Sequence, residues 1–287
     1  MTLAGSVRAI WRYPVKSMLG EELDSSEVGE RGLTGDRAWA LVSDDGKIVS
    51  AKNPRKWGTL FGYRAALVET PRSAHDLPAV RITLPDGRVV RTDDAAVNRL
   101  LSDALGHETT LTNVAPDAPV LEELWLDGSP DGRAVTDERF ARGSPGSFFD
   151  FGDVHLVTTS TLEKLTELAP ESRFDPRRFR PNLLVATDSP AGFVENAWIG
   201  GIVAVGDEVR LAITDPCGRC VMTTLPQEDL PADAAVLRTA ARHNRVVGGE
   251  DRGADGVYPA SVGVYARVVR GGRVRRGHPV QVLGTSK

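Results

Sequence analysis

Apolar and polar residues alternate over many short stretches of the chain, which is the pattern of half-buried β-strands. The first such stretch covers residues 6–13 and ends at Pro14. The same pattern predicts further strands at residues 38–42, 48–50, 65–69, 80–84, 88–92, 151–157, 183–185, 208–213, 262–269 and 273–283. Strands this short, joined by tight turns such as Asp44-Asp45-Gly46-Lys47, are typical of a barrel or a sandwich.

Helical periodicity is confined to three stretches, residues 93–105, 162–168 and 229–243. In the first, Asp93 or Asp94 is expected to cap the helix and Gly106 to end it. Residues 112–147 are rich in proline, glycine and aspartate, so a domain boundary is expected there, dividing the chain into residues 1–115 and 116–287. The expected class is therefore mainly β with a few helices (α+β).

Composition excludes several classes of protein. The chain of 287 residues is 41% hydrophobic and carries a net charge of -4, so it can bury a core and has no global basic character for nucleic acid. No apolar run approaches the roughly 20 residues of a membrane span, and no secretion signal begins the chain. We expect a cytoplasmic protein that binds neither membrane nor nucleic acid. Its two cysteines fit a reducing compartment and are too few for an internal iron-sulfur domain.

Both cysteines, Cys217 and Cys220, follow the strand predicted at residues 208–213, where Pro216 and Gly218 should end it in a turn. A thioredoxin-like pair would open a helix, whereas a β-prone run follows here, and the five histidines are too scattered for a zinc site. Two readings stay open. One thiolate could bind a soft metal centre that brings its other ligands, with Arg219 lowering the thiol pKa or holding an anion. Alternatively, both thiols are buried without a task, although an intervening arginine argues against this.

Candidate anion-binding residues occur in several loops. Lys16 and Ser17 could offer an ammonium and a hydroxyl group to one anion, or Lys16 could be an ordinary surface lysine. Arg37 precedes a buried strand, and either faces a site or pairs with an acid such as Asp36.

Two further candidates lie in the second half of the chain. A run of hydroxyl residues at a strand-to-helix junction combines capping with exposed amides that can bind phosphate: Thr158, Thr159, Ser160 and Thr161. Ordinary N-capping of the helix would account for one or two of these four hydroxyl residues. Before the strand at residues 183–185, arginines and an amide concentrate bidentate anion-binding capacity: Arg177, Arg178, Arg180 and Asn182. Solvated surface charge is the alternative for these arginines, and His155 is expected to be structural.

Taken together, five motifs resemble the MOSC family in its longer form, as in the mitochondrial amidoxime-reducing components and their bacterial relatives. They are Tyr13-Pro14-Val15-Lys16-Ser17, Gly35-Asp36-Arg37, Arg178-Phe179-Arg180-Pro181-Asn182, Cys217-Gly218-Arg219-Cys220 with Thr223-Thr224, and Gly263-Val264-Tyr265-Ala266. The resemblance implies an N-terminal β-barrel domain followed by a β-barrel-like MOSC domain.

The resemblance also implies a molybdenum cofactor. In this cofactor a pterin with a terminal phosphate binds the molybdenum ion through its dithiolene group, and one cysteine thiolate of the protein is a further ligand of the metal. The second cysteine of the pair has this role in the family, so Cys220 would be the metal ligand and catalytic residue. The residues in or beside the segments that cradle the cofactor are Lys16, Ser17, Arg37, Thr158, Thr159, Ser160, Thr161, Arg180, Asn182, Gly218, Arg219 and Tyr265.

The implied activity is the reduction of N-hydroxylated or N-oxide-type small molecules, with electrons from a separate iron-sulfur or flavin protein. The alternatives are a carrier of the cofactor or of sulfur without turnover, and a domain that has lost the cofactor. Two departures from relatives leave the substrate open: Met18 in the pocket wall, and Asn196 beside Glu195 where similar proteins tend to carry a second acid.

Overall fold

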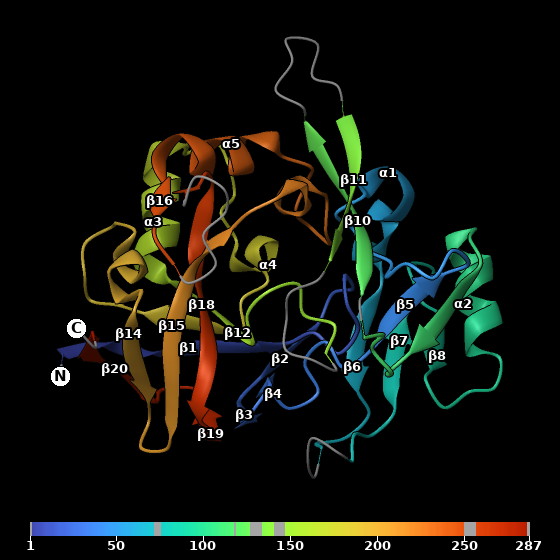
Figure 1. Cartoon of the computed structure of the whole chain (residues 1–287), viewed down its shortest axis with the longest axis horizontal. Coiled ribbons are helices and arrows are strands. Elements are labelled where there is room, and N and C mark those ends of the chain that lie inside the picture. The colour runs from blue at the N-terminus through green and yellow to red at the C-terminus, as the bar shows by residue number, and fades with distance from the viewer. Residues whose placement is uncertain are drawn as a thin grey trace.

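A closed barrel of seven strands forms the larger part of the computed structural model, which describes residues 2–71, 76–117, 119–126, 134–140, 147–249 and 257–285. Around the barrel the strands are β13 (Leu183–Ala186), β12 (Val154–Thr158), β18 (Ser261–Arg270), β15 (Val209–Gly218), β14 (Gly201–Val205), β20 (Pro279–Thr285) and β1 (Thr2–Arg12). β1 pairs with β13 to close the ring, and β2 (Glu21–Leu23) extends it from β1. Neighbouring strands are antiparallel except β12 and β13. Figure 1 shows both termini beside this barrel.

The barrel core comes from strand alternation. On β15, Val209, Leu211 and Ile213 are buried while Arg210 and Ala212 between them are only half-buried, as the period of two predicts. They pack with inward residues of the other strands, including Val264 on β18 and Val203 on β14.

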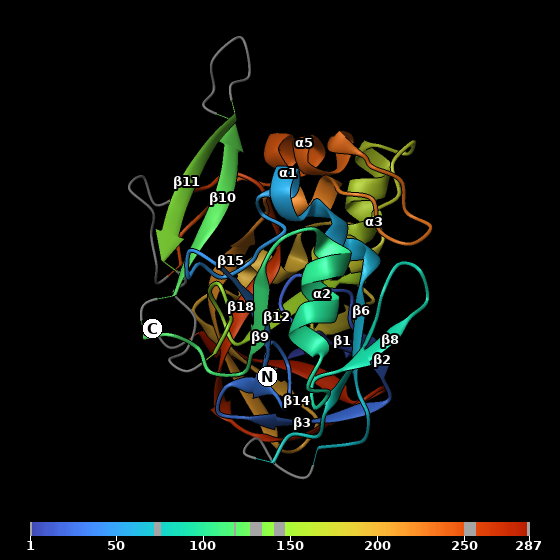
Figure 2. The ribbon, with the colours of Figure 1, turned by 90° about the vertical axis from the view of Figure 1, so that its right-hand side faces the viewer.

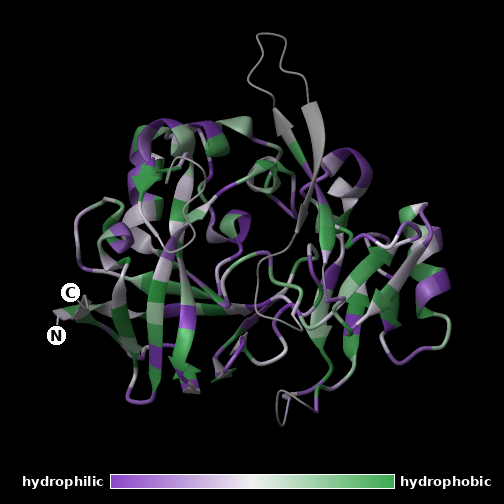
Figure 3. Cartoon of the chain, viewed as in Figure 1, coloured by the Kyte–Doolittle hydropathy of each residue, from purple (hydrophilic) through white to green (hydrophobic). Residues whose placement is uncertain are grey.

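Most of the described residues between 14 and 117 form the second part of the molecule, here called the N-terminal part, around a separate core that includes Met18, Trp57 and Leu101. Its elements are β5 (Ala40–Ser43), α1 (Pro54–Trp57), η1 (Gly58–Gly62), β6 (Arg64–Leu67), β7 (Val80–Thr83), β8 (Val89–Arg91), α2 (Val97–Leu105) and β9 (Thr109–Thr112). β3 (Ser25–Gly29) and β4 (Gly32–Leu33) instead contribute Val28 and Leu33 to the barrel core. In Figure 3 hydrophobic residues run along the strands of both parts.

The remaining helices cover one end of the barrel and complete a third apolar cluster, which includes Leu165, Val236 and Val262. They are α3 (Thr159–Leu168), α4 (Pro176–Phe179), η2 (Val194–Trp198), η3 (Val221–Thr224) and α5 (Ala234–His243), accompanied by the strand pair β16 (Val246–Val247) and β17 (Val257–Tyr258). A hairpin of β10 (Val120–Leu126) and β11 (Ala134–Phe140) runs upward in Figures 1 and 2, and its base packs on the N-terminal part, where Leu121 contacts Ile48. Across the described ranges, no helix has the length and apolar content to cross a membrane.

The expected class, mainly β with a few helices, is confirmed. Several local predictions were wrong. β15 continues through Pro216 to Gly218, because register shifts on either side of Pro216 accommodate the missing N–H, so Cys217 lies in a strand. Residues 221–224 form a short helix, not a β-run, and residues 112–147 include a hairpin.

Other boundaries moved by a few residues. The expected strand at residues 273–283 is two strands, β19 (Gly272–Arg275) and β20. The strand expected at residues 48–50 is represented by two isolated bridges of Ile48, to Val42 and to Leu121. Gly106 ends α2 in the left-handed conformation, as expected. The N-cap residue of α2 is Ala96 rather than Asp93 or Asp94. Residues 250–256 of the expected polar loop lie outside the described residues. The division at residue 115 stays a prediction, and β1 pairs with strands of the barrel.

We expect Gly263→Ala to destabilise the protein more than Gly277→Ala. Both glycines have a φ of +80°, so the left-handed strain is the same, but a Cβ at Gly263 would lie 2.3 Å from the carbonyl oxygen of Leu156. No atom lies within 4 Å at Gly277. Urea unfolding should show a further loss of about 1–3 kcal/mol in the free energy of unfolding for Gly263→Ala, the usual cost of overpacking. Equal losses would contradict the close approach.

Candidate functional site

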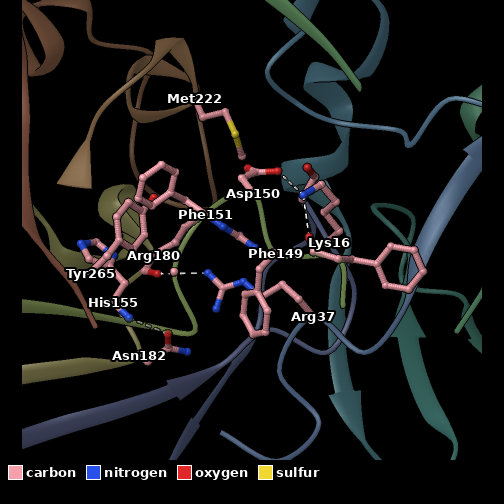
Figure 4. A pocket seen from close by; sticks show the side chains of 13 residues that line it. Lys16, Arg37, Phe149, Asp150, Phe151, His155, Arg180, Asn182, Met222 and Tyr265 are labelled. Carbon is pink, nitrogen blue, oxygen red and sulfur yellow. Dashed lines mark hydrogen bonds and ion pairs between the residues drawn. The ribbon is translucent and has the colours of Figure 1, made fainter. Parts of the chain in front are cut away.

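A cavity of about 80 Å³ lies between the barrel and the N-terminal part. Figure 4 shows its side chains converging from both parts. The lining consists of Lys16, Ser17, Arg37, Phe148, Phe149, Asp150, Phe151, Gly152, His155, Arg180, Asn182, Met222 and Tyr265. Six residues predicted from the sequence therefore meet here, drawn from segments far apart along the chain: Lys16, Ser17, Arg37, Arg180, Asn182 and Tyr265.

Lys16 is buried at the cavity wall and bound to the segment that precedes β12. Its Nζ donates to the Phe148 carbonyl oxygen at 2.7 Å and forms an ion pair with Asp150. Lys52 also pairs with Asp150, at 3.4 Å. Burial alone would raise the pKa of Asp150, but the charges of Lys16 and Lys52 outweigh it and hold the pKa well below its usual range. The two lysines thus hold one internal anion at this wall.

The Asp36 carboxylate, which is fully buried, joins the two parts beside the cavity. It accepts hydrogen bonds from the Tyr13 backbone N–H at 2.7 Å and from the Asn182 side-chain amide at 2.9 Å, and it pairs with Arg37. The sequence left two roles open for Arg37, an ion pair with Asp36 or a place in a site. The structure shows both, because Arg37 pairs with Asp36 and also lines the cavity.

Two arginine side chains pack on the Tyr13 ring. The guanidinium carbons of Arg37 and Arg180 are 4.5 Å and 4.2 Å from its centroid, within cation-π distance. Arg180 donates to the Met18 carbonyl oxygen at 2.7 Å, and burial, reinforced by the charge of Arg37, lowers its pKa to about 10. Two neighbouring cations, the buried Arg180 and the half-buried Arg37, make this end of the cavity favourable for a negatively charged ligand.

The cysteine segment lies beside the cavity without lining it. Arg219 donates to the Cys217 Sγ at 2.6 Å and to the Phe179 carbonyl oxygen at 2.9 Å, while its buried Nε has no hydrogen-bond partner among the described residues. Cys220 is half-buried, and burial raises the pKa of its thiol although Lys52 opposes this. Met222, two residues later, reaches the cavity.

The hydroxyl run, residues 158–161, does not line the cavity. Thr158 caps α3, and the hydroxyls of Thr158 and Thr161 donate to Glu195 Oε2 at 2.7 Å and 2.6 Å. Ser160 donates to the Ser189 carbonyl oxygen, and the Thr159 hydroxyl accepts from the Thr187 N–H. Phosphate binding by these four residues stays a prediction, which their internal hydrogen bonds do not favour.

The arginine cluster separates into three roles that composition alone could not distinguish. Arg178 is completely buried and donates to four backbone carbonyls, including those of Thr223 and Leu225 just after the cysteines. Arg177 forms surface ion pairs with Asp175, Glu228 and Asp229. Only Arg180 lines the cavity. Gly218 and Arg219 are absent from its lining.

Sequence reasoning missed the segment 148–151, which supplies three phenylalanines and Asp150 to the lining. A charged residue among aromatic ones just before a buried strand was the available signal. The structural role expected for His155 stays a prediction. Its Nε2 lies 3.1 Å from the Val262 carbonyl oxygen and burial lowers its pKa to about 3, but the residue also lines the cavity. Within the described ranges, no three His, Cys, Asp or Glu side chains form a metal-binding group.

Two family descriptions match the chain. Residues 146–281 match the MOSC domain, and residues 4–59 match the MOSC N-terminal beta barrel domain. Both lie within the parts that meet at the cavity.

Curated relatives are similar over most of the chain at low identity. The mitochondrial amidoxime reducing component 2 of Rattus norvegicus is 23% identical over 96% of this chain and 82% of its own length. The mitochondrial amidoxime-reducing component 1 of Homo sapiens is 24% identical over 98% of this chain and 83% of its own length. A molybdenum cofactor sulfurase of Oryza sativa subsp. japonica is 24% identical over 77% of this chain but only 28% of its own length.

Among solved structures, the YuaD protein from Bacillus subtilis aligns with a TM-score of 0.44 and 12% identity, over 98% of this chain and 97% of that one. This score is below the level that would establish a shared fold.

We expect Glu195→Gln to change how stability depends on pH. Glu195 is completely buried, and burial raises the pKa of its carboxyl group despite the two threonine hydroxyls. A raised folded-state pKa favours folding at low pH, and this advantage is lost as the pH rises from the unfolded value, about 4.3, through the folded one. Glutamine cannot ionise, so the variant should gain stability relative to the wild type as the pH rises from about 4 to 7.

Urea unfolding across this pH range measures the effect. Glu163→Gln, on the exposed face of the same helix α3, is the matched control and should give a difference that does not vary with pH. A pH-independent difference for Glu195→Gln as well would show that Glu195 has no raised pKa.

Proposed function

Because this chain belongs to the MOSC family, with the MOSC N-terminal β-barrel domain preceding the MOSC domain, we propose that it binds a molybdenum cofactor and reduces N-hydroxylated or N-oxide-type small molecules. The observation that carries the proposal is the meeting of Lys16, Arg37 and Arg180 at one cavity beside the Cys217–Cys220 segment. The names of the relatives support the activity, since those matching most of this chain are amidoxime reducing components.

The chemistry of the cavity fits an anionic cofactor. Three cations line it, and the buried Nε of Arg219 beside it is a donor without a partner among the described residues. Its volume of about 80 Å³ is small beside the roughly 300–1,000 Å³ of ordinary ligand pockets. A whole pterin would need more room than this, and the aromatic residues at 148, 149 and 151, which line the cavity, would have to move to provide it.

Different residues would then bind different parts of the cofactor. Arg37 and Arg180, both packed on the Tyr13 ring, would hold the negatively charged end, and Lys16 would add a third positive charge once it leaves Asp150. Cys220 would supply the thiolate ligand, which Lys52 and Arg219 favour by lowering the pKa that burial raises. When bound, the cofactor would supply two-electron oxygen-atom transfer.

Electrons for the reaction would come from a separate iron-sulfur or flavin protein. The chain has only two cysteines, and the proposal uses one of them as the metal ligand. The division into residues 1–115 and 116–287, and the cytoplasmic location, remain parts of this proposal.

A cofactor or sulfur carrier without turnover is the second candidate, and the similarity to a molybdenum cofactor sulfurase favours it. Reduction of benzamidoxime by the purified chain, with reduced methyl viologen as electron donor, separates the two. Turnover supports the reductase, whereas tightly bound cofactor without turnover supports the carrier.

Cys220→Ser should lower this reductase activity by more than about 100-fold, since loss of a metal ligand exceeds the 10–100-fold typical of its outer partners. Cys217→Ser is the matched control, because Cys217 is buried against Arg219 rather than free to bind a metal. Activity that survives in Cys220→Ser and disappears in Cys217→Ser would reverse the ligand assignment.

Arg180→Gln should weaken retention of the pterin by about 10–100-fold, because a hydrogen bond to a charged group contributes about 1.5–3 kcal/mol. Arg177→Gln, in the short helix that Arg180 caps but on the surface, should leave it unchanged. The measurement is the fluorescence of pterin released from each purified variant. Equal retention in both variants would exclude Arg180 from the cofactor site.

A further inference from the structure

A second cavity, of about 310 Å³, shares none of its lining residues with the first. It lies between the two parts of the molecule and is lined by Trp11, Tyr13, Leu19, Gly20, Glu22, Arg64, Arg177, Gln227 and Glu228. Tyr13, whose ring contacts Arg37 and Arg180 of the first cavity, belongs to its wall. The proposed cofactor chemistry uses neither this space nor the loop at residues 227–228.

Every charged side chain of this second cavity has an ionic partner within the protein. Arg64 and Arg177 both pair with Glu228, and Arg177 pairs in addition with Asp175 and Asp229. Glu22 pairs with Arg276 at 2.7 Å. The cavity therefore presents no unpaired charge to a ligand, in contrast to the cationic first cavity, and its chemistry suits a neutral molecule.

Gln227 is the polar group of this lining that the protein leaves unsatisfied. Its side chain is 3% exposed, and neither Oε1 nor Nε2 has a hydrogen-bond partner among the described residues. A buried amide without partners is rare in folded proteins and calls for an explanation. Its neighbouring donor and acceptor match the edge of a second amide, on which donor and acceptor are also adjacent.

The loop that carries Gln227 is fixed in an uncommon conformation. Glu228 has a φ of +50°, in the left-handed region that a residue with a side chain rarely adopts. Reciprocal backbone hydrogen bonds between Gln227 and Leu230 close the turn, and ion pairs from Arg64 and Arg177 tie it to both parts of the molecule. Strain held in place by surrounding contacts is characteristic of ligand sites.

We propose that this second cavity is a binding site for a neutral, planar small molecule with an amide-like edge, such as an aromatic carboxamide. Trp11, Tyr13 and Leu19 supply the apolar wall against which the ring packs, and the Gln227 amide pairs with the edge. The positive charges of Arg64 and Arg177 in this wall are balanced by the carboxylates of Glu228, Asp175 and Asp229. No residue lines both cavities, although the Tyr13 ring in this wall also contacts Arg37 and Arg180 of the first cavity.

Nicotinamide is the probe, added to the full-length chain and followed by NMR of the five tryptophan indole N–H signals, with Trp11→Phe to assign the Trp11 signal. We expect saturable shifts largest at Trp11. Nicotinate, which has the same shape but a carboxylate, should bind at least about tenfold more weakly, because the cavity has no free cation for it.

Gln227→Leu should weaken nicotinamide binding about tenfold, as expected when a buried hydrogen-bonding pair is lost. Gln281→Leu, at the other glutamine of the chain, is the matched control and should bind as the wild type does. Absence of saturable binding to the wild type, shifts confined to other tryptophans, or equal binding by Gln227→Leu would each overturn the proposal. The wild-type indole shifts remain decisive even if Gln227→Leu fails to fold.

Discussion

The candidate site depends on one buried carboxylate. Asp36 can only accept hydrogen bonds, and it receives them from a backbone amide at the end of β1, from Asn182 of the barrel part and from Arg37 of the N-terminal part. Because each donor is itself buried or half-buried, loss of this carboxylate would leave several polar groups unsatisfied at once. The same contact therefore joins the two parts of the molecule and fixes the first of the two arginines on the Tyr13 ring.

The cationic side chains around this carboxylate are not all paired with acidic residues in the described part of the protein, which leaves room for a negatively charged ligand. Asp150 forms ion pairs with Lys16 and Lys52, and Asp36 forms one with Arg37. The Arg180 side chain donates to a carbonyl oxygen and packs on the Tyr13 and Phe61 rings, without an ion pair among the described residues. Burial lowers the pKa of Arg180 to about 10, which is still far enough above neutral pH to keep the charge. A buried cation of this kind is costly, and a negatively charged ligand would offset that cost.

The sequence predicted the strands well, because alternation between an apolar core and a polar exterior is a local signal that survives in a barrel. It also predicted six cavity residues. It could not separate Arg177, Arg178 and Arg180, since three adjacent arginines look alike until the fold turns one to the surface, one to backbone carbonyls and one to the cavity. Glu195 lies 34 residues beyond Thr161 along the chain. Local sequence patterns therefore could not predict that its carboxylate accepts hydrogen bonds from the Thr158 and Thr161 hydroxyls.

The central claim is that this arrangement holds a molybdenum cofactor. Its most direct test is the molybdenum and pterin content of the full-length chain, purified from a host that makes the cofactor. The account predicts molybdenum and pterin in equal amounts, close to one of each per chain. Protein that is folded yet carries neither would contradict it.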